Sequence, residues 1–267
     1  MADEKERLTD GNYWEGAYNS RDGNAGPFDA KDWRNFAGIQ FLEKLEKLGL
    51  DRKKVIEIGG GDAQLLCHLS GRHPESEFSV LDFSPAGCSM AAERAAREKV
   101  KLNVHCGDVF SPPEALKGAY DLVLSYGLAE HFADLAGILS AKKVFLKPGG
   151  TVFTLIPNLA SPVYRYLCGR WSAEVLKKHV LHDLESLKKG HERAGLKIAE
   201  AGYLSSVEFG MLSMAVVNME KKRKLDLWLY LWLTRLGKAV HFLEYRGIKV
   251  PSSALFSPYI YAAGRAE

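Results

Sequence analysis

Residues 55–63 of the chain read VIEIGGGDA, and this stretch decides the fold. A short run of β-forming residues passes directly into three glycines, Gly59 to Gly61, and then into a stretch with helical periodicity. Glycines at that point permit a tight turn from strand to helix and let a ligand approach the backbone closely. The exposed N–H groups at the helix start suit a carboxylate or a phosphate. On its own the turn is ambiguous, because glycine-rich turns also occur for structural reasons.

Outward from this turn, short apolar runs alternate with helical stretches. Strands separated by crossover helices require a parallel sheet with right-handed connections. The predicted strands are 54–58, 78–83, 101–106, 120–126, 151–156, 196–209 and 257–266, and the predicted helices between them are 62–71, 86–98, 132–145 and 185–194. The pattern predicts an α/β fold with a helical and aromatic lid.

The same pattern divides the chain into consecutive segments. Residues 1–50 are expected to form an N-terminal lid segment and a helix, and residues 51–207 the α/β core. Within that core, residues 157–183 are expected to be an irregular lid loop. Residues 208–250 are expected to form a helical cap insertion, and residues 251–267 the final strand of the core.

The composition is that of an ordinary globular protein, with 36 basic and 33 acidic residues and a net charge of +3. This balance argues against nucleic acid as a partner, because a phosphate-binding face needs clustered excess Lys and Arg. The four cysteines are scattered singly, without the paired spacing of a zinc site, and we expect them to pack as small apolar residues. The charged N-terminus is unlike a signal peptide and no apolar run could span a bilayer, so a cytoplasmic protein is expected.

Acidic residues stand at the ends of two further strands. Asp82 ends the second strand about twenty residues after the glycine turn, where a carboxylate can accept hydrogen bonds from ribose hydroxyls. A Ser-Pro pair follows it, so a helix cap is the alternative interpretation. Asp108 follows the third strand and could accept from an adenine amino group, with Val109 and Phe83 against the ring faces. A plain loop acid is the alternative there.

In order and spacing, five motifs together resemble the class I S-adenosylmethionine-dependent methyltransferase superfamily. The matching motifs are VIEIGGGDA (55–63), VLDFS (80–84), CGDVF (106–110), YDLVLSYGLAEHF (120–132) and LKPGG (146–150). The resemblance covers roughly residues 40–207 plus the final strand. It implies a Rossmann-like, seven-stranded, mostly parallel sheet with helices on both faces and an antiparallel last strand. It also implies S-adenosylmethionine as the cofactor.

The resemblance assigns roles to individual residues. Glu57 corresponds to the acid that engages the methionine amino group, and Gly59 and Gly61 to the floor under the methionine and ribose. Asp82 matches the ribose ligand and Asp108 the adenine ligand. The expected cofactor-binding set is completed by three neighbours of these positions, Phe83, Val109 and Tyr126.

Two positions bear on the choice of family. Ala63 stands where many members carry a third glycine, a small change that should be tolerated. A Rossmann dehydrogenase would need G-x-G-x-x-G, but Gln64 occupies the place of the third glycine. The LKPGG turn before a strand has no counterpart in the dehydrogenase pattern either. A dehydrogenase is therefore the disfavoured alternative.

His131 follows the fourth strand, next to where the methyl group is expected, and is the main candidate for a general base. The alternative is that Glu130 and His131 line the cofactor pocket or cap the turn. This stretch is also similar to the ubiquinone-pathway O-methyltransferases, which carry Glu-x-x-Glu-His here and hold a divalent metal with it. Gly127 replaces the first acid in this chain, so we expect no metal.

Aromatic residues and histidines outside the core are candidates for the acceptor site. His182 is a second catalytic candidate and His179 a substrate-binding one, with surface or capping histidines as the alternative. Aromatic side chains can cover an apolar planar substrate or simply pack the lid onto the core. The expected substrate-binding aromatics are Tyr13, Trp14, Tyr18 and Trp33.

Residues 219–247 combine a Lys/Arg cluster with a very apolar helix. Leu225, Trp228 and Trp232 belong to one apolar stripe, and neighbouring leucines widen it. Such a helix must bury itself in a cap, a dimer partner or a membrane interface. A lid or homodimer helix and peripheral membrane contact remain open as alternatives.

The function that these features predict is transfer of a methyl group to a hydroxyl or an amine of a small hydrophobic or aromatic metabolite. One alternative is methylation of a lipid-linked or sugar intermediate at the membrane surface. A binding module that keeps the cofactor fold without catalysis is the other. The acids Glu57, Asp82 and Asp108 are all present, which argues against the binding module without excluding it.

Overall fold

The computed structural model describes residues 7–19, 26–219, 221 and 223–267. Its centre is a seven-stranded sheet with the strand order β3-β2-β1-β4-β5-β7-β6. The strands are β1 (Lys54–Ile58), β2 (Glu77–Asp82), β3 (Asn103–Cys106), β4 (Tyr120–Tyr126), β5 (Leu146–Pro157), β6 (Leu196–Leu204) and β7 (Tyr259–Ala266). All neighbours are parallel except β7, which pairs antiparallel with both β5 and β6. The Rossmann-like fold predicted from the five motifs is confirmed.

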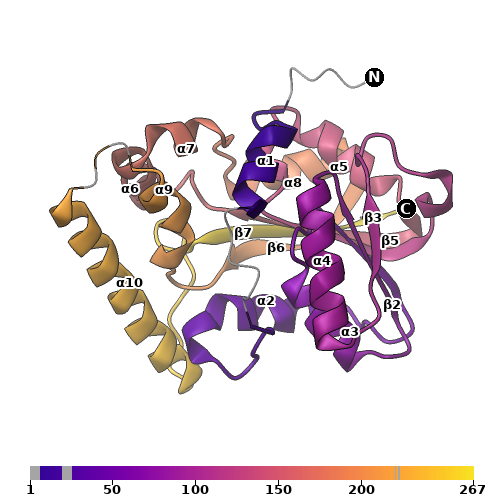
Figure 1. Ribbon diagram of the computed structural model, residues 1–267, viewed down its shortest axis with the longest axis horizontal. Helices are drawn as coiled ribbons and strands as arrows, with labels where there is room; N and C mark the ends of the chain where they lie inside the picture. Colours follow the sequence, from indigo (N-terminus) through magenta and orange to yellow (C-terminus); the bar gives the residue numbers. More distant parts are fainter. Residues whose placement is uncertain (1–6, 20–25, 220, 222) are drawn as a thin grey trace.

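Helices cover both faces of this sheet (Figure 1). One face packs against α2 (Phe36–Glu46), α3 (Gln64–Arg72) and α4 (Pro85–Glu98), and the other against α5 (Leu135–Lys143) and α8 (Leu184–Arg193). Each helix contributes aliphatic side chains to a buried cluster on its own side, which is the layered packing that a parallel sheet requires. The helix α1 (Gly11–Asn19) lies apart from these layers and contacts α4.

The start of α4 shows how the local sequence fixes the backbone beside the glycine turn. Ser84 adopts an extended conformation, its hydroxyl accepts the N–H of Gly87, and Pro85 occupies the first helical position. This arrangement satisfies a backbone donor at the helix start and presets the backbone angle of the first turn. The chain therefore leaves β2 in a defined direction, with Asp82 at the end of the strand.

A separate layer caps the end of the sheet that carries the glycine turn. It consists of α6 (Pro162–Trp171), α7 (Ala173–Lys177), η5 (Phe209–Leu212), α9 (Ser213–Val217) and α10 (Lys224–Tyr245). These elements share a third buried cluster, which includes Tyr164, Trp171 and Phe209. Figure 1 shows α10 along one side of the molecule, away from the sheet. We call these five elements the cap.

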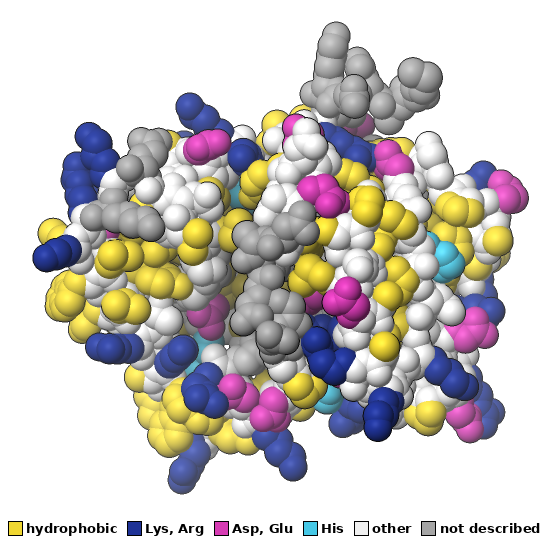
Figure 2. Space-filling model, viewed as in Figure 1, with side chains coloured by type: hydrophobic (Ala, Val, Ile, Leu, Met, Phe, Trp, Pro, Cys, Tyr) yellow, Lys and Arg dark blue, Asp and Glu magenta, His cyan; other side chains and the backbone are white. Residues whose placement is uncertain are grey.

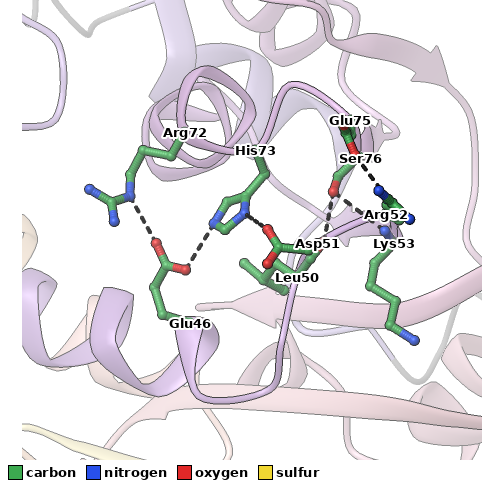
Figure 3. A network of polar contacts seen from close by, with 9 residues as sticks. All are labelled: Glu46, Leu50, Asp51, Arg52, Lys53, Arg72, His73, Glu75 and Ser76. Atoms are coloured by element: carbon green, nitrogen blue, oxygen red, sulfur yellow. Dashed lines mark hydrogen bonds and ion pairs between the residues drawn. The ribbon is translucent and has the colours of Figure 1, made fainter.

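A polar network holds the opposite end of the sheet, where β1 and β2 begin (Figure 3). The imidazole of His73 lies between the carboxylates of Glu46 and Asp51, with 2.8 Å to each. The Nε of Arg72 donates to the other oxygen of Glu46 at 2.9 Å. These contacts join the ends of α2 and α3, so the two helices that flank the glycine turn are fixed to each other at their far ends.

Several predicted boundaries differ from the structure. Residues 157–183, expected to be irregular, contain the helices α6 and α7, and the N-terminal aromatic segment contains α1. Residues 146–150, expected to be a turn, belong to β5, where Gly149 has a φ of +74°. The expected insertion helix is divided into η5, α9 and α10. Short helices interrupted by serine and proline leave too little periodicity to be recognised.

Candidate functional site

The backbone of the glycine turn after β1 accommodates residues larger than glycine poorly. Gly59 and Gly61 have φ angles of +71° and +51°. A Cβ atom on Gly60 would lie 2.6 Å from a methyl carbon of Val80, and one on Gly61 would lie 2.6 Å from the hydroxyl of Tyr18. Ala63 also adopts the left-handed region, with φ of +51°, which explains why glycine suits this position. The three glycines thus let neighbouring side chains pack directly against the backbone of the turn at the carboxyl end of the sheet.

Glu57 is the most strongly perturbed acid beside this turn. Its side chain is buried next to the turn and lines the cavity described below. Burial raises the pKa of Glu57 to about 8, and the negative charges of Asp62 and Asp82 add to the rise. A buried carboxylate without a cation is costly, so this position favours a ligand that brings a positive charge.

Asp82 stands at the end of β2 with both carboxylate oxygens engaged. Its Oδ2 accepts the N–H of Gly61 at 2.9 Å and the hydroxyl of Tyr18 at 3.2 Å, and its Oδ1 accepts the N–H of Ser84 at 2.9 Å. Burial raises the pKa of Asp82, and these hydrogen bonds oppose the rise. The Tyr18 hydroxyl therefore sits where a ribose hydroxyl is predicted to bind.

A cavity of about 570 Å³ opens over the glycine turn and extends to the cap. It is lined at one end by Glu57 and Asp82 and at the other by Glu208, Met211 and Tyr259. Among the described residues that line it, the charged ones are all acidic, and none is Lys, Arg or His. The cavity therefore suits a ligand with positive charge at one end and an apolar or hydrogen-donating group at the other.

Asp108 lies in a second, smaller pocket of about 30 Å³ that adjoins the first. Phe83, Gly59 and Trp14 line both pockets, and Val109 lines the small one. Arg7 and Thr9, from the segment before α1, also line the small pocket. The guanidinium of Arg7 pairs with Asp108 and stacks over the rings of three phenylalanines, Phe83, Phe110 and Phe132, at 5.4, 5.2 and 5.6 Å from their centroids.

A third pocket of about 130 Å³ lies on the other side of Trp14. Tyr13, His131 and His179 line it together with apolar cap residues, and Met211 is shared with the large cavity. The structure therefore brings three of the predicted acceptor residues, Tyr13, Trp14 and His179, to one place. Tyr18 lines the large cavity instead.

His131 is poorly suited to the predicted role of general base. Its Nδ1–H donates to the carbonyl of Lys178 at 2.8 Å, which leaves Nε2 with the lone pair. Burial lowers the pKa of His131 to about 3, and the neighbouring His179 lowers it further. A base with so low a pKa has little tendency to accept a proton near neutrality. Its base role remains an untested prediction that this environment disfavours.

Glu130, His131 and His179 offer ligand atoms that all lie within 4.8 Å of one another. Burial raises the pKa of Glu130 to about 8, and its Oε2 has no hydrogen-bond partner among the described residues. One carboxylate and two imidazoles form a donor set that can hold a divalent metal. The sequence predicted no metal because Gly127 replaces an acid, but it did not reveal that His179 lies close to Glu130 and His131. The prediction that the protein binds no metal is untested. Treating the protein with a chelator would test it for this cluster.

Three other predicted residues have distinct environments. Trp33 does not line the large cavity; its ring packs against Phe242 of α10, with 5.3 Å between centroids. His182 is buried, burial lowers its pKa, and its side chain does not line any of these three pockets. Tyr126 lines the large cavity, and its hydroxyl bonds to that of Tyr259 at 2.9 Å.

Sequence reasoning missed Glu208 at the acceptor end of the cavity. Its Oε1 accepts the N–H of Gly210 at 2.7 Å, and its Oε2 lies 3.6 Å from Nδ1 of the fully buried His241. His241 in turn donates from Nε2 to the carbonyl of Val207 at 2.5 Å. Glu208 belongs to no motif, because its position depends on how the chain leaves β6 and meets α10.

Comparisons with known proteins identify similar domains and folds. Residues 56–152 match a family model described as a methyltransferase domain. The ubiquinone biosynthesis O-methyltransferase of Acinetobacter baylyi is 30% identical over 160 residues, which cover 58% of this chain and 64% of that protein. The geranyl diphosphate C-methyltransferase of Streptomyces coelicolor A3(2), solved with Mg²⁺, geranyl-S-thiolodiphosphate and S-adenosyl-L-homocysteine, has a TM-score of 0.55 at 16% identity, over 85% of this chain and 75% of that one. The cyclase SpnF has a TM-score of 0.60 at 15% identity, over 92% and 84%.

The chain spans less than two thirds of the curated relatives it matches. It covers 64% of the Acinetobacter enzyme and 5% of the highly reducing polyketide synthase 40 of Fusarium pseudograminearum. The structural likenesses are all at low sequence identity and show the fold alone, and one of these neighbours is a cyclase. The comparisons leave the acceptor open.

Proposed function

We propose that this chain is a class I S-adenosylmethionine-dependent methyltransferase and that it transfers a methyl group from S-adenosylmethionine to a small acceptor; the match of residues 56–152 to a methyltransferase-domain model supports the proposal. The observation that carries the proposal is the convergence of Glu57, Asp82 and Asp108 on two adjoining pockets beside the glycine turn. A fold alone does not define an activity, so the argument rests on these side chains.

The residues present fit the cofactor. Glu57, buried without a cation, would hold the methionine ammonium, and Asp82 would accept from the ribose hydroxyls once Tyr18 yields its bond. Gly59 and Gly61 line the cavity, and their lack of side chains would permit close approach of the sugar and the methionine. Asp108 would accept from the adenine amino group. When bound, the cofactor supplies an electrophilic methyl group on a positively charged sulfur.

The chain's contribution to the reaction is to align the acceptor, to exclude water and to receive a proton. A nucleophilic oxygen or nitrogen forms the new bond to the methyl carbon as the sulfur–carbon bond breaks, and the nucleophile must lose its proton. Glu208 lines the cavity and is the carboxylate placed to accept that O–H or N–H. Its Oε1 already accepts the N–H of Gly210, so Oε2, which lies 3.6 Å from Nδ1 of His241, is the oxygen that would receive the proton.

The walls of the acceptor end favour a small apolar or aromatic molecule. Phe41, Met211, Met214, Tyr126 and Tyr259 line this part of the cavity. Aromatic and thioether side chains pack well against planar apolar ligands, while Glu208 provides one polar contact that orients the reacting group. We therefore propose a hydroxyl or an amine on such a molecule as the methyl acceptor.

Calorimetric titration with S-adenosylhomocysteine tests the proposed cofactor site. Asp82→Ala removes the predicted ribose contact and should weaken binding by roughly 10- to 100-fold, since hydrogen bonds to a charged group contribute about 1.5–3 kcal/mol. Glu114→Ala is a suitable control, because its side chain is 87% exposed and lines none of the three pockets. Equal affinities for the two variants would exclude Asp82 from the site.

A screen of metabolites for products that gain one methyl group tests the catalytic part. Glu208→Gln should lower turnover while leaving the affinity for S-adenosylhomocysteine unchanged. Binding of the cofactor without a methylated product across a broad screen would instead support a non-catalytic binding module.

A further inference from the structure

The helix α10 is oriented with its polar residues inward. Asp226, Gly237 and His241 are its buried residues. The carboxylate of Asp226 forms a 2.8 Å ion pair with Arg170 of α6, and Gly237 packs against Phe209 of η5. The apolar stripe of the sequence, for which a cap, a dimer partner and a membrane interface were the alternatives, therefore faces outward over much of its length.

The exposed side of α10 is rich in large apolar side chains. Trp228 and Trp232 are 61% and 49% exposed, and their rings stack with 6.5 Å between centroids. We define the outer face of α10 as the exposed residues Leu225, Trp228, Leu231, Trp232, Leu236, Phe242 and Leu243. Single exposed apolar residues are common on proteins, but a continuous apolar helix face marks an interaction surface.

Positive charge surrounds this face. Four exposed basic residues belong to the helix or end it: Lys224, Arg235, Lys238 and Arg246. Both acidic residues of α10 are engaged on the inner side, Asp226 with Arg170 and Glu244 with the hydroxyl of Ser206 at 2.8 Å. Figure 2 shows yellow and dark blue side chains together on the side where Figure 1 places α10. The outer face is thus apolar and basic at once.

This combination distinguishes between the candidate partners. A second copy of the chain in a symmetric pair would bring the same lysines and arginines toward each other, which costs energy. Protein interfaces are also depleted in lysine at their cores. An anionic lipid surface satisfies both features, because acyl chains accept the apolar side chains and headgroups attract the bases. No helix in the described ranges is long and apolar enough to cross a membrane.

We infer that the outer face of α10 docks on the surface of an anionic lipid bilayer, with the helix axis in the plane of the interface. Trp228 and Trp232 insert at the headgroup level, where amphipathic rings are favoured. Lys224, Arg235 and Arg246 contact lipid phosphates.

The position of α10 gives this docking a consequence for the cavity. The helix packs on η5, and Gly210 and Met211 of η5 line the large cavity. Docking therefore holds the acceptor end of the cavity one helix layer from the lipid. Where the proposed methyl transfer holds, this geometry favours an acceptor that resides in the membrane.

Co-sedimentation of the full chain with vesicles tests the inference. Vesicles of phosphatidylcholine that contain about one third phosphatidylserine should bind the protein at least roughly tenfold more strongly than vesicles of pure phosphatidylcholine. Raising the salt from about 0.1 M to about 1 M should weaken that preference, because screening shortens the reach of the charges. Tryptophan emission should shift to shorter wavelength on binding.

Two double variants separate the apolar and the electrostatic contributions. Trp228→Ser with Trp232→Ser should reduce binding at least roughly tenfold and remove most of the emission shift. Lys224→Gln with Arg235→Gln should reduce binding to the anionic vesicles roughly 10- to 30-fold, because each lost positive charge weakens binding by about tenfold or less. The matched control is Lys188→Gln with Lys189→Gln on α8, where both side chains are exposed. This control should bind as the unmodified protein does.

Cofactor binding and the oligomeric state of the variants serve as controls for the vesicle experiment. Calorimetry with S-adenosylhomocysteine should give equal affinities for all three variants, which shows that they are folded and keeps this test separate from the proposed methyl transfer. Equal sedimentation of the unmodified protein with and without anionic vesicles would overturn the inference. So would a dimer in analytical ultracentrifugation that Trp228→Ser with Trp232→Ser dissociates while vesicle binding is absent.

Discussion

Glu57 couples cofactor binding to a proton. Its pKa is raised to about 8 in the ligand-free protein because the carboxyl group is buried near two other acids. A ligand ammonium placed against it would lower that pKa, so binding between about pH 5 and pH 8 should release a proton from Glu57. Affinity for S-adenosylhomocysteine should accordingly rise with pH up to about 8.

Calorimetry in two buffers of different ionisation enthalpy measures that release. The apparent enthalpies should differ for the unmodified protein and agree more closely for Glu57→Gln, which cannot titrate. The same difference in both proteins would assign the proton to another group.

The sequence predicted the site residues that follow strands, but it did not predict the site residues that other segments contribute. Asp82 and Asp108 were identified because parallel strands bring their carboxyl ends to one edge of a sheet. Glu208 and Arg7 reach the site through segments without periodicity, so their place depends on tertiary packing. Trp33 shows the converse, since an aromatic residue in the expected segment packs on α10 instead.

The N-terminal segment and α1 occupy part of the predicted nucleoside site. Arg7 pairs with Asp108, and Tyr18 donates to Asp82. Arg7→Ala should therefore strengthen binding of S-adenosylhomocysteine by roughly 5- to 10-fold, because a partly buried ion pair and its cation–π contacts together contribute about 1–1.5 kcal/mol. Arg34→Ala is the control, as its side chain is 62% exposed. Weaker binding by the Arg7 variant would mean that Arg7 covers a bound nucleoside instead.

The elements of the core were predicted more accurately than those of the cap. The bounds of β1 and β4 agree with the sequence pattern, because their buried apolar runs end sharply at glycine and turn residues. The helices α6 and α7 were missed, since α6 is short and rich in aromatic residues and α7 has only five residues. The sequence left the role of α10 open between a lid, a homodimer helix and a membrane-contacting helix, because hydrophobicity alone cannot tell a buried face from a docking face.

At the scale of the molecule, the cap has its own small core. Its buried cluster is distinct from the two clusters that sandwich the sheet. Regions with fewer buried contacts open at lower free energy than the central strands. Amide hydrogens of α10 should therefore exchange at least roughly tenfold faster than those of β1 and β4 in a hydrogen-exchange experiment. Equal protection of α10 and β1 would show that cap and sheet unfold as one unit.

The place of β7 between β5 and β6 also governs how the chain assembles while it is being made. Strand β6 ends at Leu204, but its neighbour β7 begins only at Tyr259. At a synthesis rate of about 5–20 residues per second, β6 waits on the order of 3–10 s for the strand that joins it to the sheet. During that interval the nascent chain exposes the unpaired edge of β5. A chaperone that shields such edges on the ribosome would therefore act on this protein between the emergence of β6 and that of β7.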